Sequence, residues 1–273
     1  MKFTVVGASG FIGGALSAKL QDLGHEVFAP VRGENSLFER SLGHVIHAAG
    51  ITADFRSRPF DTLRANTTFL ADILERGTFD SLLYLSSARV YRHAEHTRED
   101  ARIFLSPEDP EDLYDFTKLT SESLCHALDR ADVRVVRLSN VVGKDFRSGN
   151  FLFDLIRNAC DVGEIHLRSA LDSTKDYVSI DDVVEQIPKI CVSGRHDCYN
   201  LGSGVNLTHR QLVEQIQAVS GARLTVGEDA PRMVVEAIDI SRLRDEFSYQ
   251  PTAVLPLICE LTNEYRKQVH AEN

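Results

Sequence analysis

The chain has 273 residues, of which 43% are hydrophobic and 26% charged, a composition that excludes wholesale disorder and allows one large domain or two small ones. Its formal net charge of −10 disfavours general nucleic-acid binding, because an acidic surface repels phosphate backbones. No apolar run is long enough for a bilayer span or a secretory signal, so we expect no membrane partner.

The cysteine and histidine spacings predict neither disulfides nor a metal site. The five cysteines form no C-x-x-C pair, which favours reduced thiols in a cytoplasmic protein. The densest histidine cluster, His93-Ala94-Glu95-His96, lies in a polar stretch without a third ligand, so we expect a solvated loop there and no metal.

Strand-like and helix-like segments alternate along the chain, which predicts an α/β protein with a parallel sheet. The predicted strands are Phe3–Val6, Glu26–Ala29, His44–His47, Leu82–Leu85 and Val133–Leu138. Apolar residues at helical spacing predict helices from Ile12 to Leu23, from Phe60 to Leu74, after Pro110, and after the capping box of Thr208 and Gln211.

A glycine-rich turn, Gly7-Ala8-Ser9-Gly10-Phe11-Ile12-Gly13, lies between the first strand and the first helix. Gly7 permits a tight turn, Gly10 lets the backbone approach a pyrophosphate at the helix N-terminus, and Gly13 allows close packing. We therefore assign this segment, with Ser9, Phe11 and Ile12, to a dinucleotide cofactor. The alternative is a turn whose glycines serve packing alone.

The residues after the second strand favour NADP(H). An NAD site usually has an acid there that binds the ribose 2′-hydroxyl. The segment reads Ala29-Pro30-Val31-Arg32-Gly33-Glu34, and the Arg32 guanidinium matches the 2′-phosphate of NADP. Two alternatives stay open: Arg32 is an exposed surface residue, or Glu34 folds back and serves NAD(H).

Tyr114 and Lys118 lie one helical turn apart, on the same face. A nearby ammonium favours the phenolate and lowers the pKa of a tyrosine, so Tyr114 is a candidate proton donor or acceptor for a substrate oxygen. Lys118 is also a candidate ligand of the nicotinamide ribose. Ser87 follows a buried strand, where it is expected to hold the substrate oxygen, or else to cap the backbone.

Taken together, the segments resemble the extended short-chain dehydrogenase/reductase family, also called NAD-dependent epimerase/dehydratases. The ordered matches are Gly7–Gly13, Val45–Gly50, Asn66, Leu85–Tyr91, Tyr114 with Lys118, Arg137–Gly143, Lys175–Val183 and Tyr199–Gly204. The resemblance implies a Rossmann-like doubly wound parallel sheet with a smaller C-terminal α/β substrate lobe. We expect residues 1–143 and 176–202 in the dinucleotide-binding domain, and 144–175 and 203–273 in the lobe.

The resemblance also implies roles for individual residues. Ser87, Tyr114 and Lys118 would form the catalytic set, and a nucleotide sugar would be the substrate. Ala48, Ala49, Gly50, Asn66 and Val141 would bind the cofactor. Asn140, Lys175 and Arg232 would bind the phosphate-sugar portion or the diphosphate of the substrate. A homodimer would form through the helices that carry Asn66 and Tyr114.

Two departures from the family pattern refine these expectations. The segment between the second strand and Val45 is too short for the usual extra strand, so we expect a shortened sheet with a more open adenine side. Dehydratases that make 4-keto-6-deoxy sugars carry Asp-Glu where this chain has Ala88 and Arg89, which disfavours that reaction. Arg89 binds an anionic substrate group or faces solvent, and both readings stay open.

The sequence therefore predicts an NADP(H)-preferring reductase of a 4-keto nucleotide sugar. One alternative is a nucleotide-sugar epimerase that retains NAD. Further alternatives are an NADP-dependent reductase of a non-sugar carbonyl and a non-catalytic dinucleotide sensor.

Overall fold

The computed structural model describes residues 1–31, 34–52 and 54–272, and of residues 35 and 270–272 the backbone alone. The chain divides into two compact units. The first unit consists of Met1–Ser139, Ile180–Leu201 and Asp239–Tyr249, and the second of Asn140–Ser179, Gly202–Ile238 and Gln250–Asn273.

The first unit is built on a six-stranded parallel sheet with the order β2-β1-β3-β4-β5-β9. Its strands are β1 (Lys2–Val6), β2 (Glu26–Phe28), β3 (His44–His47), β4 (Ser81–Ser87), β5 (Val133–Leu138) and β9 (Cys198–Leu201). Because β2 and β3 lie on opposite sides of β1, the strand order reverses there. In open α/β sheets, ligands bind outside the carboxyl ends of the strands at such a point.

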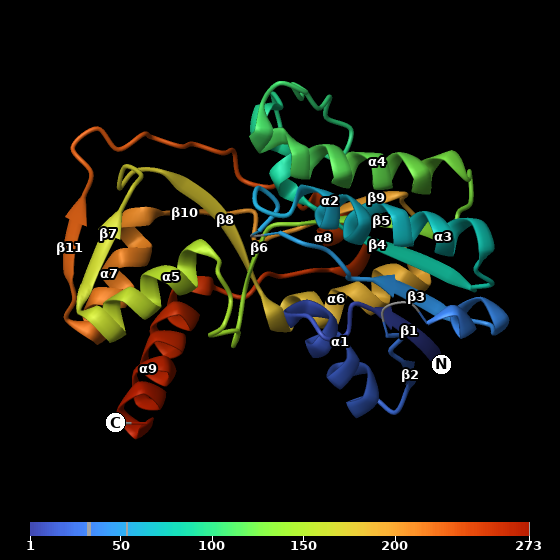
Figure 1. Cartoon of the computed structure of the whole chain (residues 1–273), viewed down its shortest axis with the longest axis horizontal. Coiled ribbons are helices and arrows are strands. Elements are labelled where there is room, and N and C mark those ends of the chain that lie inside the picture. Colours follow the sequence, from blue (N-terminus) through green and yellow to red (C-terminus); the bar gives the residue numbers. More distant parts are fainter. Residues whose placement is uncertain (32–33, 53, 273) are drawn as a thin grey trace. The chain divides into compact units, whose positions relative to one another are not determined.

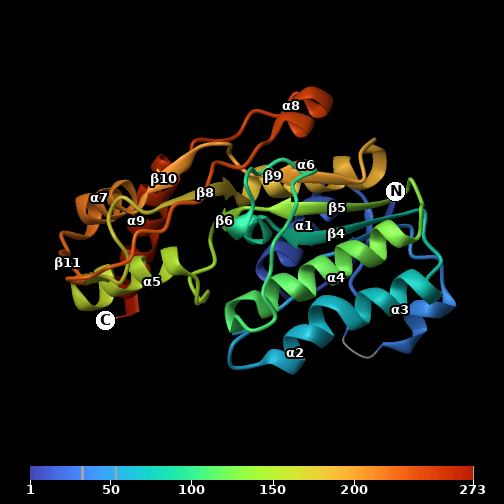
Figure 2. The same ribbon diagram turned by 90° about the horizontal axis from the view of Figure 1, so that it is seen from above.

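Helices cover both faces of this sheet (Figures 1 and 2). One face carries α1 (Phe11–Asp22) and α6 (Ile180–Ser193), and the other carries α2 (Pro59–Leu63), η2 (Arg64–Thr68), α3 (Phe69–Arg76) and α4 (Leu113–Ala127). The shorter helices of the unit are η1 (Asn35–Glu39), η3 (Ala88–His93), η4 (Pro110–Asp112) and α8 (Ser241–Phe247).

The predicted fold class is confirmed, including the shortened sheet. The chain passes from β2 through η1 directly into β3, so β2 forms one edge of the sheet among the described residues. The central strands are buried on both faces, as a parallel sheet covered by two helix layers requires.

The helix predicted from Phe60 to Leu74 is three helical segments, because α2 and α3 are joined by the π-helical turn η2. The wider π turn changes the phase of the helix, so the apolar residues before it do not share the buried face of those after it. Phe60 is 73% and Leu63 is 46% exposed, whereas Leu70 is buried. The spacing that predicted one helix therefore does not place Phe60 and Leu63 on the buried face of Leu70.

The second unit contains two small sheets, with the strand orders β10-β8-β6 and β11-β7, and three α-helices. Its elements are β6 (Asn140–Val142), α5 (Phe151–Arg157), η5 (Asn158–Val162), β7 (Glu164–Leu167), β8 (Thr174–Ser179), β10 (Asn206–Thr208), α7 (His209–Ser220), β11 (Arg223–Val226) and α9 (Val254–Glu272). The predicted capping box is confirmed, because the Thr208 hydroxyl and the Gln211 side chain each bond the other residue's backbone N–H.

The boundaries of the units differ from the expected domain boundaries in two ways. Residues 140–143 and 176–179 belong to the second unit, where β6 pairs with β8, and so does Gly202. Residues 239–249, expected in the smaller lobe, belong to the first unit, where α8 packs against β9. Strand pairing and helix packing between distant segments decide both differences.

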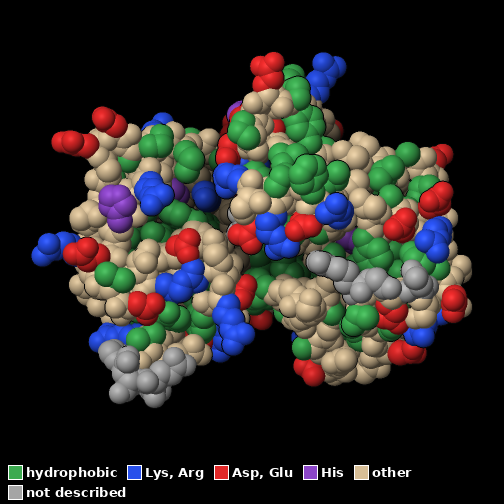
Figure 3. Space-filling model, in the orientation of Figure 1, with side chains coloured by type: hydrophobic (Ala, Val, Ile, Leu, Met, Phe, Trp, Pro, Cys, Tyr) green, Lys and Arg blue, Asp and Glu red, His purple; other side chains and the backbone are tan. Residues whose placement is uncertain are grey.

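The surface carries charges of both signs. On the face shown in Figure 3, Lys and Arg side chains are interspersed with Asp and Glu side chains over both units. Among the described helices, none has the combination of length and apolar composition that a membrane crossing requires.

A buried ion pair anchors α4 to the sheet of the first unit. The Arg137 guanidinium on β5 donates to both carboxylate oxygens of Glu122 on α4, with the shortest N–O distance at 2.6 Å. The Ser86 hydroxyl on β4 donates to the same carboxylate, and Arg137 also donates to the Tyr91 hydroxyl at 2.8 Å. Both charges are therefore hydrogen-bonded as well as paired, which a buried ion pair needs in order to be stable.

We expect Arg137→Met to destabilise the protein by about 3–5 kcal/mol, because it leaves the buried Glu122 carboxylate without a partner. The double variant Arg137→Met/Glu122→Gln should recover part of this loss, since no buried charge remains. Chemical unfolding followed by circular dichroism measures both changes. As a control, Arg130→Met breaks a surface pair with Asp132 and should cost at most about 1 kcal/mol. Equal losses in Arg137→Met and Arg130→Met would contradict the prediction.

Candidate active site

The glycine-rich turn after β1 lies directly against the backbone that follows β3. Gly7 has φ = 88°, a conformation that glycine adopts without strain. A Cβ atom at Gly7 would lie 2.6 Å from the backbone nitrogen of Ala49, and the Ala48 N–H donates to the Val6 carbonyl at 2.9 Å. The turn and residues 48–50 therefore form one backbone cradle at the carboxyl edge of the sheet.

The N-terminus of α1 opens from this cradle. A Cβ at Gly13 would lie 2.2 Å from the Gly7 carbonyl oxygen, so the helix packs on the turn in a way that only glycine permits. Gly10 caps the helix without a side-chain hydrogen bond among the described residues, and the first turn has no acidic residue. The first N–H groups of α1 are therefore available to an anion, and the cradle fits a dinucleotide pyrophosphate.

Gly50 and Asn66 bring the loop after β3 to α4. A Cβ at Gly50 would lie 2.8 Å from Asn66 Oδ1 and 3.4 Å from Lys118 Nζ. Asn66, on the π turn η2, accepts a hydrogen bond from the Ile51 N–H at 3.0 Å and donates to the Thr117 hydroxyl at 2.9 Å. The buried Asn66 amide thus holds the loop beside Lys118, a contact that the sequence pattern did not reveal.

Tyr114 lies on the first turn of α4 and is only 3% exposed. The side chains of Ser87, the last residue of β4, and of Thr52, in the loop after β3, lie close enough to the Tyr114 hydroxyl to lower its pKa. The ring of Phe55, from the same loop, lies with its centroid 5.7 Å from that of Tyr114. The structure thus brings Ser87 and Tyr114 together, and it adds Thr52 and Phe55, which no local sequence signal marked.

Lys118 points from α4 toward the end of β4. Its Nζ donates to the Leu85 carbonyl at 2.9 Å and lies 5.8 Å from the centroid of the Tyr114 ring. Burial lowers the pKa of Lys118 to about 8, and the negative charge of Glu122, one turn further along α4, opposes that change. Lys118 therefore lies beside Tyr114 on one helix face, as the spacing predicted.

The pKa of Tyr114 corrects the expectation drawn from the Tyr114–Lys118 spacing. Burial raises the pKa of Tyr114 above its ordinary value, although hydrogen bonds from Thr52 and Ser87 oppose the increase. Burial dominates because the phenolate is a charged form that loses its hydration, whereas the Lys118 ammonium is nearly 6 Å from the ring centre. Tyr114 in this structure therefore holds its proton firmly.

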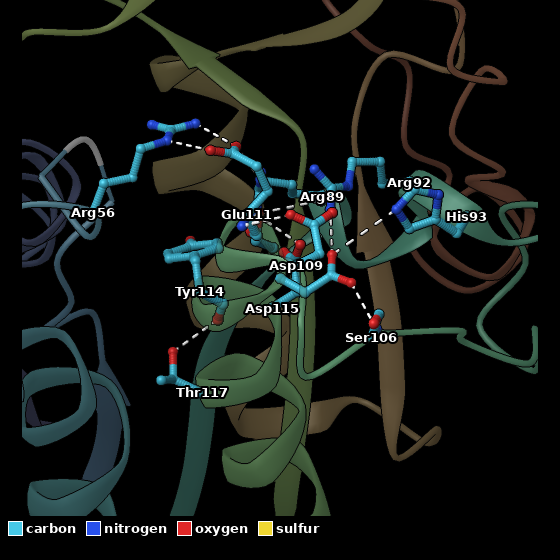
Figure 4. Close-up of polar contacts among 12 residues, drawn as sticks. Arg56, Arg89, Arg92, His93, Ser106, Asp109, Glu111, Tyr114, Asp115 and Thr117 are labelled. Carbon is cyan, nitrogen blue, oxygen red and sulfur yellow. Dashed lines mark hydrogen bonds and ion pairs between the residues drawn. The ribbon is translucent and has the colours of Figure 1, made fainter. Parts of the chain in front are cut away.

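Arg89 on η3 is held by two acidic residues of the first unit, an arrangement that neither sequence reading foresaw (Figure 4). It donates to Asp115 Oδ2 at 2.6 Å and to the carbonyl oxygen of Glu111 at 3.0 Å. The Glu111 carboxylate also pairs with Arg56. The Arg89 side chain is thus engaged within the protein.

The residues that bear on cofactor choice lie after β2. Arg32, predicted to bind the 2′-phosphate of NADP, lies outside the described residues. The carboxylate of Glu34 accepts hydrogen bonds from the Ser36 hydroxyl at 2.7 Å and the Val31 N–H at 3.1 Å, and these bonds lower its pKa. Glu34 is thus bonded to its own loop.

The remaining predicted residues belong to the second unit. On β6, Asn140 donates through its amide to the Asp176 carbonyl at 2.8 Å, and Val141 follows it. Lys175, on the paired strand β8, lies with Nζ 4.6 Å from the Phe151 ring centroid. Arg232 forms an exposed ion pair with Asp172 at 2.6 Å. Asn140 and Lys175 thus lie on neighbouring strands, whereas Arg232 lies in the chain after β11.

One further group has the composition of a metal site. Within the described part of the chain, ligand atoms of His93, Asp109 and Asp112 lie within 4.8 Å of one another. The guanidinium of Arg92 pairs with both carboxylates, and Asp112 also accepts a bond from the Ser106 N–H at 2.8 Å. Because Arg92 already pairs with both carboxylates, we assign the group to the structure of this segment.

Comparisons with known proteins agree with the geometry of the first unit. Residues 3–202 match the family described as NAD dependent epimerase/dehydratase family. A curated relative, dTDP-4-dehydro-6-deoxyglucose reductase of Escherichia coli, is 24% identical over 209 residues, which cover 71% of this chain and 64% of the relative. The chain spans between 61% and 64% of the lengths of the first curated relatives that it matches.

Solved structures share the fold over nearly the whole chain. MoeE5 in complex with UDP-glucose and NAD is 22% identical with a TM-score of 0.82, and the match covers 98% of this chain and 100% of that one. RMD from Pseudomonas aeruginosa complexed with NADPH is 22% identical with a TM-score of 0.76, covering 97% and 100%. With the cradle of Gly7–Gly13 and the family match over residues 3–202, these likenesses lead to one conclusion: the chain belongs to the NAD dependent epimerase/dehydratase family.

Proposed function

We propose that this protein is an NADPH-preferring reductase of a 4-keto nucleotide sugar. The observation that carries the proposal is the meeting of Ser87, Tyr114 and Lys118 beside the glycine cradle, at the carboxyl edge of the parallel sheet. A hydroxyl pair next to a dinucleotide-binding turn is suited to proton transfer at an oxygen whose carbon exchanges a hydride.

The chain's own residues would act on the carbonyl oxygen of the substrate. Bound NADPH supplies the hydride to the carbonyl carbon. Ser87 would donate a hydrogen bond that orients the oxygen, and Tyr114 would transfer its proton to that oxygen as negative charge develops there. Lys118 would stabilise the resulting phenolate through its ammonium charge and would bind the nicotinamide ribose.

The proton that Tyr114 holds is the one that reduction of a carbonyl requires. Because burial raises the pKa of Tyr114, the phenol keeps its proton at neutral pH and can donate it. An epimerase begins with oxidation of the sugar. In that step the same tyrosine would have to accept a proton, which requires its phenolate form. Epimerisation with retained NAD is therefore the second candidate, and the solved UDP-glucuronic acid 4-epimerase of Bacillus cereus, with a TM-score of 0.80, supports it.

The substrate class is inferred from the second unit and from the relatives. Lys175 and Arg232 are basic residues there, and Asn140 is a candidate ligand for the phosphate-sugar portion. The names of the relatives include a keto-sugar nucleotide reductase and complexes with UDP-glucose. A homodimer through the helices that carry Asn66 and Tyr114 stays a prediction.

The preference for NADPH rests on the segment after β2. No acid ends β2, and Glu34 is engaged with Ser36 and Val31, so Arg32 is the residue that we assign to a 2′-phosphate. This segment is the basis of the cofactor proposal.

We expect the purified protein to oxidise one NADPH for each molecule of a 4-keto sugar nucleotide, such as dTDP-4-keto-6-deoxyglucose. Absorbance of NADPH and chromatography of the sugar nucleotide measure the two amounts. An epimerase with retained NAD would convert its sugar nucleotide without consuming added NADPH. That result would overturn the reductase in favour of the second candidate.

We expect Tyr114→Phe to reduce turnover by about 10²–10⁴-fold, the usual contribution of a positioned proton donor, while NADPH still binds. Steady-state kinetics and quenching of NADPH fluorescence measure the two effects. Tyr265→Phe is a matched control, because it removes a hydroxyl that bonds Asp161 in the second unit. Unchanged turnover in Tyr114→Phe would remove Tyr114 from the reaction.

We expect Arg32→Ala to weaken the binding of NADPH more than that of NADH, because only NADPH carries the 2′-phosphate. Fluorescence titration with each cofactor measures the two dissociation constants. Arg130→Ala, which removes an exposed arginine paired with Asp132 away from this segment, serves as the control and should leave their ratio unchanged. Equal weakening of both cofactors by Arg32→Ala would contradict the NADPH preference.

A further inference from the structure

Asp115 is a buried carboxylate next to the proposed proton donor. It follows Tyr114 on the first turn of α4 and is 0% exposed. Its Oδ2 accepts a hydrogen bond from Arg89 at 2.6 Å, whereas its Oδ1 is buried without a partner among the described residues. A half-satisfied anion at this depth is costly, so its position beside Tyr114 calls for an explanation.

Arg89 supplies the balancing charge from another part of the fold. It lies on η3, two residues after Ser87, and its guanidinium carbon is 5.7 Å from the centroid of the Tyr114 ring and 5.2 Å from that of Phe55. Glu111 holds the guanidinium with its carbonyl oxygen at 3.0 Å and its carboxylate at 3.3 Å. Figure 4 shows Arg89, Asp115 and Tyr114 gathered at the start of α4.

The charges on Asp115 and Arg89 act on the Tyr114 phenol in opposite directions. The Asp115 carboxylate raises the pKa of Tyr114, and the Arg89 guanidinium lowers it. Asp115 is also flanked by Arg92 and Asp112, and Lys118 lies 5.8 Å from the Tyr114 ring. Among these neighbours, Arg89 is the cation that both bonds the Asp115 carboxylate and lies over the Tyr114 ring.

We propose that Arg89 is a positioning residue for Tyr114: it pairs with the buried Asp115 carboxylate and so prevents that negative charge from opposing ionisation of the phenol. This inference rests on the proposed function, in which Tyr114 gives up its proton. It also replaces the two sequence readings of Arg89, because its donors are bonded to Asp115 and Glu111.

The ionisation of Asp115 is compatible with this role. Burial raises the pKa of Asp115 to about 6, and Arg89 opposes the increase. Asp115 is therefore an anion throughout the pH range in which a phenol ionises, so its charge is present whenever Tyr114 loses its proton.

The chain contains a matched control for Arg89. Arg92 lies on the same 3-10 helix, one turn later, and pairs with Asp112, a buried carboxylate one turn before Asp115. Arg92→Gln therefore breaks an ion pair of the same kind between the same two segments, but not the pair next to Tyr114. A general loosening of η3 affects both variants. Arg92 acts on Asp115 only at a distance, whereas Arg89 bonds it directly, so loss of the balancing charge should affect Arg89→Gln much more strongly.

The test is a pH titration of Tyr114 by NMR in the full chain, with and without saturating NADP⁺. Each tyrosine carries ¹³C at Cζ, and the Tyr114 resonance is the one that Tyr114→Phe removes. Arg89→Gln should leave about tenfold less phenolate at a given pH, because the Asp115 charge is then unbalanced. Asp115→Asn should change the titration in the opposite direction, and the double variant should return close to wild type.

The outcomes separate this inference from the proposed function. Coincident Tyr114 titrations in Arg89→Gln and Arg92→Gln would overturn it, and so would a double variant that still titrates like Arg89→Gln. If Arg89→Gln does not fold, Asp115→Asn decides the question. A lower Tyr114 pKa in that variant supports the inference, and an unchanged one overturns it. Failure of the wild type to reduce any keto-sugar nucleotide would overturn the proposed function and leave these titrations valid.

Kinetics provide a second measurement on the active enzyme. We expect Arg89→Gln to lower kcat and to leave KM within about twofold, because a positioning residue acts on the reacting group and not on substrate binding. A raised KM with an unchanged Tyr114 titration would instead identify Arg89 as a ligand of a substrate anion, and would overturn the inference.

Discussion

The attachment of α4 to β4 and β5 is the contact on which the candidate site depends. Three turns of one helix face meet the sheet: Tyr114 lies beside Ser87, Lys118 donates to the Leu85 carbonyl, and Glu122 pairs with Arg137. Apolar packing alone has no direction, whereas each of these polar bonds fixes an angle and a register. The reacting hydroxyls are therefore placed by the same bonds that hold the helix in position.

Burial has opposite effects on the two ionisable groups of the site. It raises the pKa of Tyr114 and lowers that of Lys118 to about 8, because each charged form loses its hydration. The phenol thus keeps its proton until charge develops on a neighbouring oxygen. Fixed charges then determine how readily it ionises, and the Arg89–Asp115 pair is one of them.

Much of the site was predictable because its signals are local. The glycines of the first turn, the Tyr114–Lys118 spacing and the position of Ser87 at a strand end all depend on neighbours within a few residues. The π turn η2 could not be predicted, because no residue type in the apolar pattern indicates such a turn. Thr52, Phe55 and the partners of Arg89 were also hidden, since they reach Tyr114 from segments far apart in the chain.

The sequence by itself determined the alternation of strands and helices and the dinucleotide turn, because backbone preferences and periodicity are properties of short segments. The shortened sheet followed from comparison of a loop length with the pattern of the resembled family. Only the tertiary structure decided which charges face Tyr114 and where the two units divide. Electrostatic interactions and strand pairing act through space and are independent of separation along the chain. The raised pKa of Tyr114 illustrates that distinction. The spacing revealed the lysine, but burial, which has the largest effect on this pKa, exists only in the folded protein.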